Sequence, residues 1–355
     1  MKGPLQGQTI ELDHRAVFLR DAPAQATVIA ASSDGHVTLI RDRSIVARTQ
    51  LAAAKISEIC LHPRQPLLAY SDERRGQLHV TTLDDRQILK RGSTRFRNTS
   101  LSSPHLGYSA CFFGENGESL WCTYAENADS VHVEVYRVSD WTLASSVVVA
   151  DPFGGSWCSF HPTSQPDMVA LWLAAGQDGQ QVVWLHWRGG KLLATLEPLL
   201  RDTTPPTFAP RGDEFLAMDG DYEHGIRKFR FPAVAELPGC KGPWAGEETF
   251  GYSLCYLDDT LALVSSATDR PFLLDVTSMT IIDELAIAGH EPRPAEEIYR
   301  QLVGDKELCT DLSYFARIGS DVVFVSCRDW RNSPNERLDD LIFVPVSTVR
   351  EAVRI

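Results

Sequence analysis

The sequence predicts an all-β fold: a single β-propeller domain over residues 1–355, with seven blades of four short antiparallel strands. Three observations predict it. A strand–turn–strand phrase recurs seven times, with spacings of 42, 51, 48, 48, 48 and 59 residues between equivalent turn positions. A large apolar residue stands two positions before each turn, and a small residue stands three positions before the five middle turns. The composition, 43% hydrophobic and 23% charged, is that of a globular protein with a large core.

The first strand of each repeat is marked by its large apolar residue. The seven are Leu19, Leu61, Phe112, Phe160, Phe208, Tyr256 and Phe315. First strands crowd around the axis of a radial array, so one side must be small while the other fills the space between neighbouring sheets. Cys60, Cys111 and Cys255 occupy the small position. Because the chain has no CxxC pair, we interpret these cysteines as small buried packing residues rather than metal ligands.

The remaining strands of each repeat are separated by recognisable turns. An apolar second strand follows the turn position, as in PLLAYSD at 66–72 and DMVALWL at 167–173. Acidic or glycine turns such as SSDG at 32–35 end it, because Asp can bond its own backbone and Gly adopts positive φ. An alternating third strand follows, such as QVVWLHW at 181–187, and a more polar fourth strand, such as TLASSVVV at 142–149, closes the unit.

The two ends of the chain complement each other. The last repeat, from Leu312 to about Val349, supplies three clear strands, whereas QTIELD at 8–13 forms a spare strand before the first repeat. We therefore expect the N-terminal strand to complete the last blade, which removes exposed strand edges. Six or eight blades remain open alternatives, because the spacings of 42 and 59 depend on how the irregular repeats are aligned.

Over essentially its full length the chain resembles a degenerate seven-bladed propeller of the WD40 type. FAPRGDEFLA at 208–217 matches that family's strand–turn–strand phrase, and SDWTL at 139–143 is the nearest echo of its Trp-Asp mark. No repeat has the family's Gly-His and Trp-Asp pair at the expected places. The resemblance implies a rigid platform that binds other proteins.

Short aromatic segments occupy one slot of the repeat. They are GYSAC at 107–111, GSWC at 155–158 and GYSLC at 251–255. Since these segments enter the first strands, we expect Tyr108, Trp157 and Tyr252 near one mouth of the central channel, where propellers of the resembled type commonly bind peptides. Aromatic side chains with a polar tip suit such anchors. The alternative is that the rings pack against neighbouring blades.

The longest insertion, residues 288–311, separates the sixth and seventh repeats and predicts a short helix. Pro294 suits a first helical position and Gly304 can end the helix. An apolar stripe on one face consists of Ala295, Ile298, Tyr299, Leu302 and Val303. The stripe either packs on its own blades or docks a partner, so Ile298, Tyr299 and Leu302 are candidate binding residues. Trp330, in the charged loop 328–340, is a further candidate anchor.

Charge and motifs disfavour several functional classes. With 34 Lys plus Arg against 47 Asp plus Glu, the net charge of −13 disfavours nucleic acid. The basic cluster at 90–100 is therefore expected to contact an acidic protein surface, or no partner at all. The acidic loop at 218–225 lacks the ligand spacing of a calcium loop, so we expect no metal or other cofactor. The longest apolar run, 168–175, is too short to span a bilayer, and the N-terminus lacks a signal-peptide core, which predicts a cytoplasmic protein.

We therefore expect a non-catalytic interaction module that binds a protein or peptide partner within a larger complex. The sequence contains no GxSxG, HExxH or P-loop motif, and His62 and His161 fall at strand-ending turn positions. The alternative is a propeller enzyme, a hydrolase or lyase, with Asp219, Glu223 and His224 among the residues of a channel site.

Overall fold

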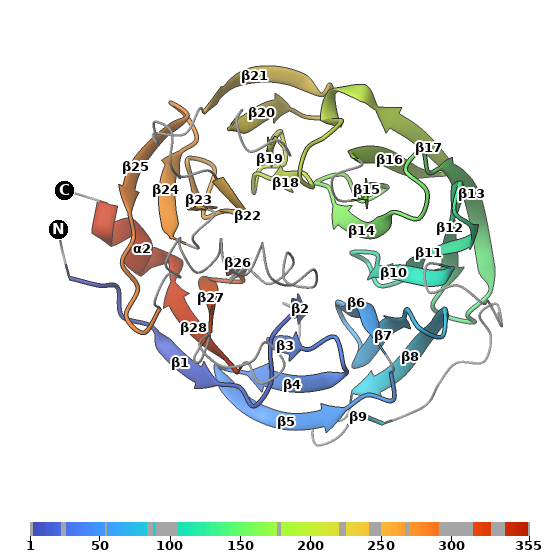
Figure 1. Cartoon of the computed structure of the whole chain (residues 1–355), viewed down its shortest axis with the longest axis horizontal. Helices are drawn as coiled ribbons and strands as arrows, with labels where there is room; N and C mark the ends of the chain where they lie inside the picture. The colour runs from blue at the N-terminus through green and yellow to red at the C-terminus, as the bar shows by residue number, and fades with distance from the viewer. Residues whose placement is uncertain are drawn as a thin grey trace, which may run out of the picture. The chain divides into compact units, whose positions relative to one another are not determined.

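The chain folds as the predicted β-propeller of seven four-stranded antiparallel blades, and nearly all of the described structure is β (Figure 1). The computed structural model describes residues 3–22, 26–53, 55–83, 88–89, 106–175, 179–219, 225–240, 250–266, 270–290, 315–327 and 338–353. Successive strands of a blade follow one another across the sheet, so the first strand lies at one edge and the fourth at the other. We call the first strand of each blade its inner strand.

Residues 17–205 form one compact unit that contains blades 1 to 4. Blade 1 comprises β2 (Phe18–Ala22), β3 (Thr27–Ala31), β4 (His36–Arg41) and β5 (Ser44–Gln50), and blade 2 comprises β6 (Ile56–Leu61), β7 (Leu67–Asp72), β8 (Gln77–Leu83) and β9 (Ile88–Leu89). Blade 3 comprises β10 (Gly107–Phe113), β11 (Ser119–Asn127), β12 (Ser130–Arg137) and β13 (Leu143–Ala150). Blade 4 comprises β14 (Trp157–Pro162), β15 (Met168–Ala174), β16 (Gln180–Arg188) and β17 (Lys191–Glu197), followed by the 3-10 turn η3 (Pro198–Leu200).

Residues 1–16 and 206–355 form a second compact unit that contains blades 5 to 7. Blade 5 comprises β18 (Thr207–Phe208), β19 (Glu214–Met218), β20 (Ile226–Arg230) and β21 (Ala235–Cys240). Blade 6 comprises β22 (Phe250–Tyr256), β23 (Leu261–Ser266), β24 (Pro271–Asp275) and β25 (Thr280–Glu284). Blade 7 comprises β26 (Phe315–Ile318), β27 (Asp321–Cys327), β28 (Asp339–Pro345) and β1 (Gln8–Glu11).

The N-terminal strand completes the last blade, as the sequence predicts. Strand β1 pairs antiparallel with β28, and Gln8 lies opposite Phe343. The pairing covers an edge of β28 that would otherwise present unpaired backbone groups. Leu5 extends the contact to blade 6, because its amide donates to the Ala286 carbonyl at 2.8 Å and its carbonyl accepts from the Ala288 amide at 2.9 Å. One segment therefore ties two blades of this unit together.

The core lies between the faces of neighbouring blades. One apolar cluster joins blades 1 and 2, and others join blades 2 and 3, 3 and 4, 5 and 6, and 6 and 7. Because second strands are covered on both faces, every residue of β3 is buried. Fourth strands alternate instead, and in β5 exposed and partly buried residues follow one another. The apolar second and polar fourth strands of each repeat thus reflect their places in the sheet.

A C-terminal helix, α2 (Val346–Val353), follows blade 7 and was not predicted from the sequence. Val346 and Val349 lie one turn apart and are buried in the cluster between blades 6 and 7, while Arg350 forms an ion pair with Asp258. The helix predicted within 288–311 lies, beyond residue 290, outside the described residues. None of the helices in the described part of the chain is long and apolar enough to cross a membrane.

Candidate functional site

Two of the predicted aromatic anchors lie beside one small pocket of the first unit. The pocket has a volume of about 100 Å³ and is lined by residues that include Tyr108 and Trp157, at the starts of inner strands β10 and β14. Glu73, between β7 and β8, also lines it. Tyr252 lies in β22 of the other unit, and its side chain is outside the described part of the structure. The short aromatic segments of the three repeats therefore lie at the starts of the inner strands of blades 3, 4 and 6.

Trp157 presents its side chain to solvent. It is 57% exposed, although most of the surface of a tryptophan side chain is buried on average. Along β14 the side chains alternate, so Phe160 faces the core between blades 3 and 4 while Trp157 points to the other face. Its cross-strand partner is Ala174, which is too small to cover an indole ring. An exposed indole on a regular strand has the character of a binding anchor.

The turn before Trp157 is held by one buried carboxylate. Asp151 is 4% exposed and accepts four hydrogen bonds from the turn. The donors are the amides of Phe153 at 3.2 Å, Gly155 at 3.0 Å and Ser156 at 2.7 Å, and the Ser156 hydroxyl at 2.7 Å. Gly155 has φ of 92°, a conformation that glycine adopts without strain. These contacts fix the turn that leads into Trp157.

Tyr108 differs from Trp157 in its surroundings. Its side chain is 1% exposed, and its hydroxyl lies 3.0 Å from Oε2 of Glu134 and 3.1 Å from the hydroxyl of Tyr136. Burial is the main cause that raises the pKa of both tyrosines, so both stay protonated and can donate. The Tyr108 ring lies in the apolar cluster that joins blades 2 and 3, as in the alternative that the rings pack against neighbouring blades.

The other candidate residues fall outside the segments that the structure describes. Ile298, Tyr299, Leu302 and Trp330 lie outside the described residues, as do the basic cluster at 90–100 and residues 220–224 of the acidic loop. Asp219, at the start of that loop, is described and lies 3.6 Å from the guanidinium of Arg227. In the described part of the chain, no group of three or more His, Cys, Asp or Glu residues could hold a metal ion.

The inner strands also carry a polar pair that sequence reasoning missed. Ser159 and His161 are alternate residues of β14, and the Ser159 hydroxyl lies 2.7 Å from Nε2 of His161. Burial, together with the positive charge of Arg20, lowers the pKa of His161 to about 3, so the ring is neutral at physiological pH. The tautomer of the ring decides which of the two groups donates this hydrogen bond. Hydroxyl–imidazole contacts of this kind activate nucleophiles in hydrolases. The S-x-H spacing within a strand is the signal that could have found the pair.

His62 has a structural role. Its Nδ1 accepts hydrogen bonds from the amides of Arg64 at 3.0 Å and Gln65 at 2.8 Å, which requires the proton on Nε2, and Nε2 donates to the Gly117 carbonyl at 2.8 Å. The ring thus closes the turn after β6 and links blade 2 to blade 3. Burial lowers its pKa.

The described geometry therefore combines an exposed Trp157 at the start of β14 with a serine–histidine contact further along the same strand. In comparisons with known proteins, no protein-family model matches the chain, and no curated protein matches its sequence.

Proposed function

We propose that the chain is a non-catalytic interaction module that binds a protein or peptide partner at the start of the blade 4 inner strand. The observation that carries this function is the 57% exposure of Trp157 at the end of a turn held by Asp151. A large aromatic side chain releases much apolar surface from water when a partner covers it. Because the turn is already ordered, binding loses little conformational entropy.

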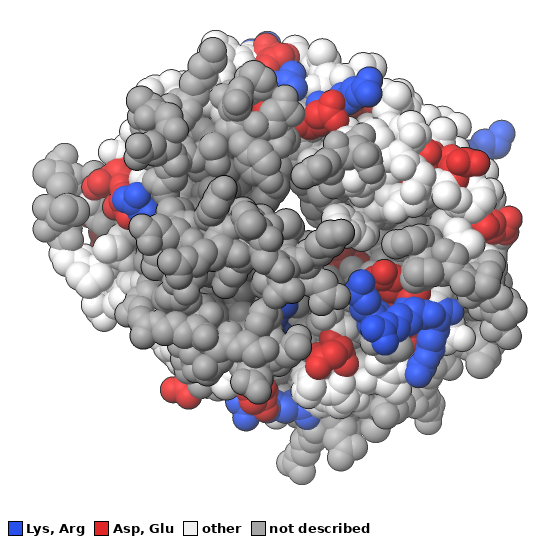
Figure 2. All heavy atoms as spheres, viewed as in Figure 1, with Lys and Arg blue, Asp and Glu red and all other residues white. Residues whose placement is uncertain are grey.

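The surroundings of Trp157 support binding of an extended polypeptide. The adjacent pocket of about 100 Å³ is far smaller than a typical small-molecule site but suits a single side chain. Arg74 and Arg75, in the turn between β7 and β8, are exposed and follow the pocket residue Glu73 directly. Figure 2 shows a group of basic side chains at lower right, over the region where Figure 1 places β7 and β8. An acidic segment of the partner would complement them.

We further propose that this module works in the cytoplasm within a larger complex and is related to WD40-type propellers. The FAPRGDEFLA phrase, which in the structure spans β18, the following turn and the start of β19, supports that relationship. The net charge of −13 supports a protein partner over nucleic acid.

Affinity capture from the native host tests the proposal. The intact chain is compared with Trp157→Ala and with a matched control, Ile282→Ala, which truncates a side chain that is 44% exposed in β25. Proteins recovered by the intact chain and the control should be lost with Trp157→Ala, and circular dichroism should show equal folding. Equal recovery by all three chains would mean that Trp157 is not the anchor.

A hydrolase is a second candidate, favoured by the contact between Ser159 and His161. A fluorophosphonate probe, which forms a bond to activated serine hydroxyls, separates the two functions. Labelling of Ser159 that disappears in His161→Gln would favour the hydrolase. We expect no labelling, because a His161 pKa of about 3 makes the imidazole a weak general base.

A further inference from the structure

A second and larger pocket lies between blades 3 and 4, at the opposite end of the inner strands from Trp157. Its volume is about 260 Å³, and its lining includes the turn after β10, the turn after β14 and Trp187 of β16. This volume is just below the range of about 300 to 1,000 Å³ that small-molecule sites occupy. The pocket therefore suits one long side chain of a polypeptide better than a free ligand.

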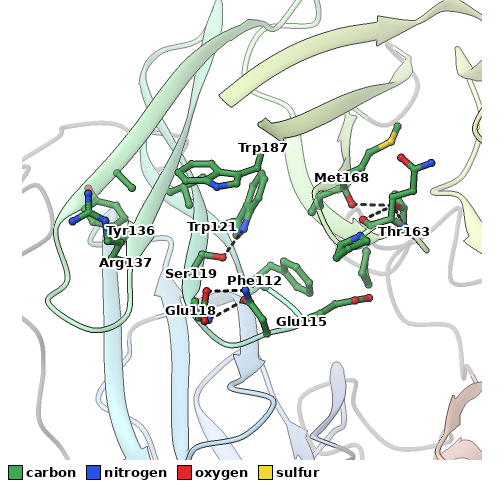
Figure 3. Close-up of a pocket in the computed structure, with 18 residues that line it drawn as sticks. Phe112, Glu115, Glu118, Ser119, Trp121, Tyr136, Arg137, Thr163, Met168 and Trp187 are labelled. Atoms are coloured by element: carbon green, nitrogen blue, oxygen red, sulfur yellow. Dashed lines mark hydrogen bonds between the residues drawn. The ribbon is translucent and has the colours of Figure 1, made fainter. Parts of the chain in front are cut away.

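Aromatic rings form one wall of this pocket. Figure 3 shows Phe112, Trp121 and Trp187 on one side, facing Met168 and Thr163 on the other. The rings of Trp121 and Trp187 have centroids 6.1 Å apart at an interplanar angle of 60°, and Trp121 Nε1 donates to the Ser119 hydroxyl at 3.1 Å. Indole faces carry negative electrostatic potential and attract cations.

Two carboxylates lie in the turn that borders the pocket. Glu115 and Glu118 are exposed, and neither forms an ion pair within the described residues. Glu118 accepts a hydrogen bond from the Asn116 side-chain amide at 3.0 Å, which orients it. Arg137 also lines the pocket, but its guanidinium lies 3.7 Å from Asp140 and is drawn away from both tryptophans (Figure 3).

We propose that this pocket binds one cationic side chain, arginine or lysine, of a polypeptide partner. The aromatic wall takes the alkyl stem and the face of the charged group, and Glu115 and Glu118 neutralise its charge. This binding mode presupposes the proposed role in protein binding. The pocket and Trp157 lie on different surfaces. An experiment can therefore disprove cation binding in the pocket without disproving the anchor role of Trp157, and the reverse.

The test uses isotope-labelled indole nitrogens, whose signals for Trp121 and Trp187 are assigned with the variants Trp121→Phe and Trp187→Phe. The probe is the peptide acetyl-Gly-Arg-Gly-amide, and its matched control carries citrulline, a neutral isostere of arginine. We expect the arginine peptide to shift the Trp187 signal saturably and the citrulline peptide to bind about tenfold more weakly. The double variant Glu115→Gln, Glu118→Gln should lose a similar factor for arginine, whereas Glu126→Gln, at the far end of β11, should not.

Two outcomes would overturn the proposal. One is an arginine peptide that shifts neither indole signal. The other is equal affinity for arginine and citrulline peptides, which would make the pocket a site for neutral side chains. If capture through Trp157 succeeds while these signals stay unchanged, only this inference fails. If the indole signals shift but Trp157→Ala captures the same proteins as the intact chain, the cation site is supported and Trp157 is not the anchor.

Discussion

The hydroxyl of Tyr108 lies 3.0 Å from Oε2 of Glu134 inside blade 3, and the Tyr136 hydroxyl donates to the same oxygen at 2.8 Å. A carboxylate that is completely buried is expensive unless hydrogen bonds replace its water. The two tyrosines supply such bonds. Tyr108 is therefore a buried structural residue, whereas Trp157, at the corresponding position of blade 4, is 57% exposed.

We expect Tyr108→Phe to lower the free energy of unfolding by about 2 kcal/mol, because a hydrogen bond to a buried charged group is lost. Tyr256→Phe is the matched control: the Tyr256 hydroxyl is buried without a hydrogen-bond partner among the described residues, so its removal should be neutral or stabilising. Urea denaturation measures both. Equal losses in the two variants would show that the contact between Tyr108 and Glu134 contributes nothing.

The blades could be predicted from the sequence because each inner strand needs a large residue on one face and a small one on the other. Phe112 and Phe160 do lie together, with ring centroids 6.5 Å apart in the core between blades 3 and 4. Whether the aromatic side chain at the start of an inner strand is exposed could not be predicted from the sequence, because its exposure depends on the residue opposite it on the next strand. Tyr124 packs against Tyr108 at 5.0 Å, whereas Ala174 leaves Trp157 uncovered.

The larger pocket was also beyond prediction from the sequence. Trp121 and Trp187 belong to different blades and meet only because β11 and β16 pack across the interface between blades 3 and 4. The sequence shows a tryptophan in each of two adjacent repeats. It does not show which strand of one blade packs against which strand of the next blade. Helix α2 was missed for a similar reason: two apolar positions one turn apart, Val346 and Val349, are also compatible with the end of a strand.

Removal of the Asp151 carboxylate should loosen the turn that positions Trp157. In Asp151→Ala, hydrogen exchange at the amides of Phe153, Gly155 and Ser156 should become faster, and capture of the Trp157 partner should weaken. Asp140→Ala is a suitable control, because Asp140 is exposed and bonds the Thr142 amide in the outer turn of blade 3. Exchange at residues 153–156 that stays as slow as in the intact chain would contradict this account of the turn.

The buried cysteines should be inert in the folded protein. Cys60 and Cys111 are free thiols whose sulfurs lie 3.6 Å apart, and burial raises the pKa of Cys111 and brings that of Cys255 to about 12. Only the thiolate reacts with iodoacetamide, so these thiols should be labelled at pH 8 in urea but not in native buffer. Mass mapping of the alkylated peptides checks this. Rapid native labelling of Cys60 or Cys111 would disagree with their role as packing residues.

The lowered pKa of the partly buried His161 predicts a specific dependence of stability on pH. Its pKa is about 3 in the folded protein and 6.5 for an unperturbed histidine, so between these values the unfolded chain binds a proton that the folded chain does not. Stability from this group is complete above pH 6.5 and declines as the pH falls toward 3, by at most about 1.4 kcal/mol per pH unit. His161→Gln lacks this loss, so its stability should approach that of the intact chain as the pH falls.

Ser159→Ala provides the control for that measurement, because it removes the hydrogen bond at 2.7 Å but keeps the imidazole. It should therefore retain the pH slope of the intact chain while losing a constant amount of stability, about 1 kcal/mol. Urea denaturation at several pH values from 8 to 4 gives all three curves. A difference in unfolding free energy between the intact chain and His161→Gln that is the same at every pH would contradict this prediction. The imidazole would then titrate alike in the folded and unfolded states. It would be available as a base near neutral pH, as the hydrolase alternative requires.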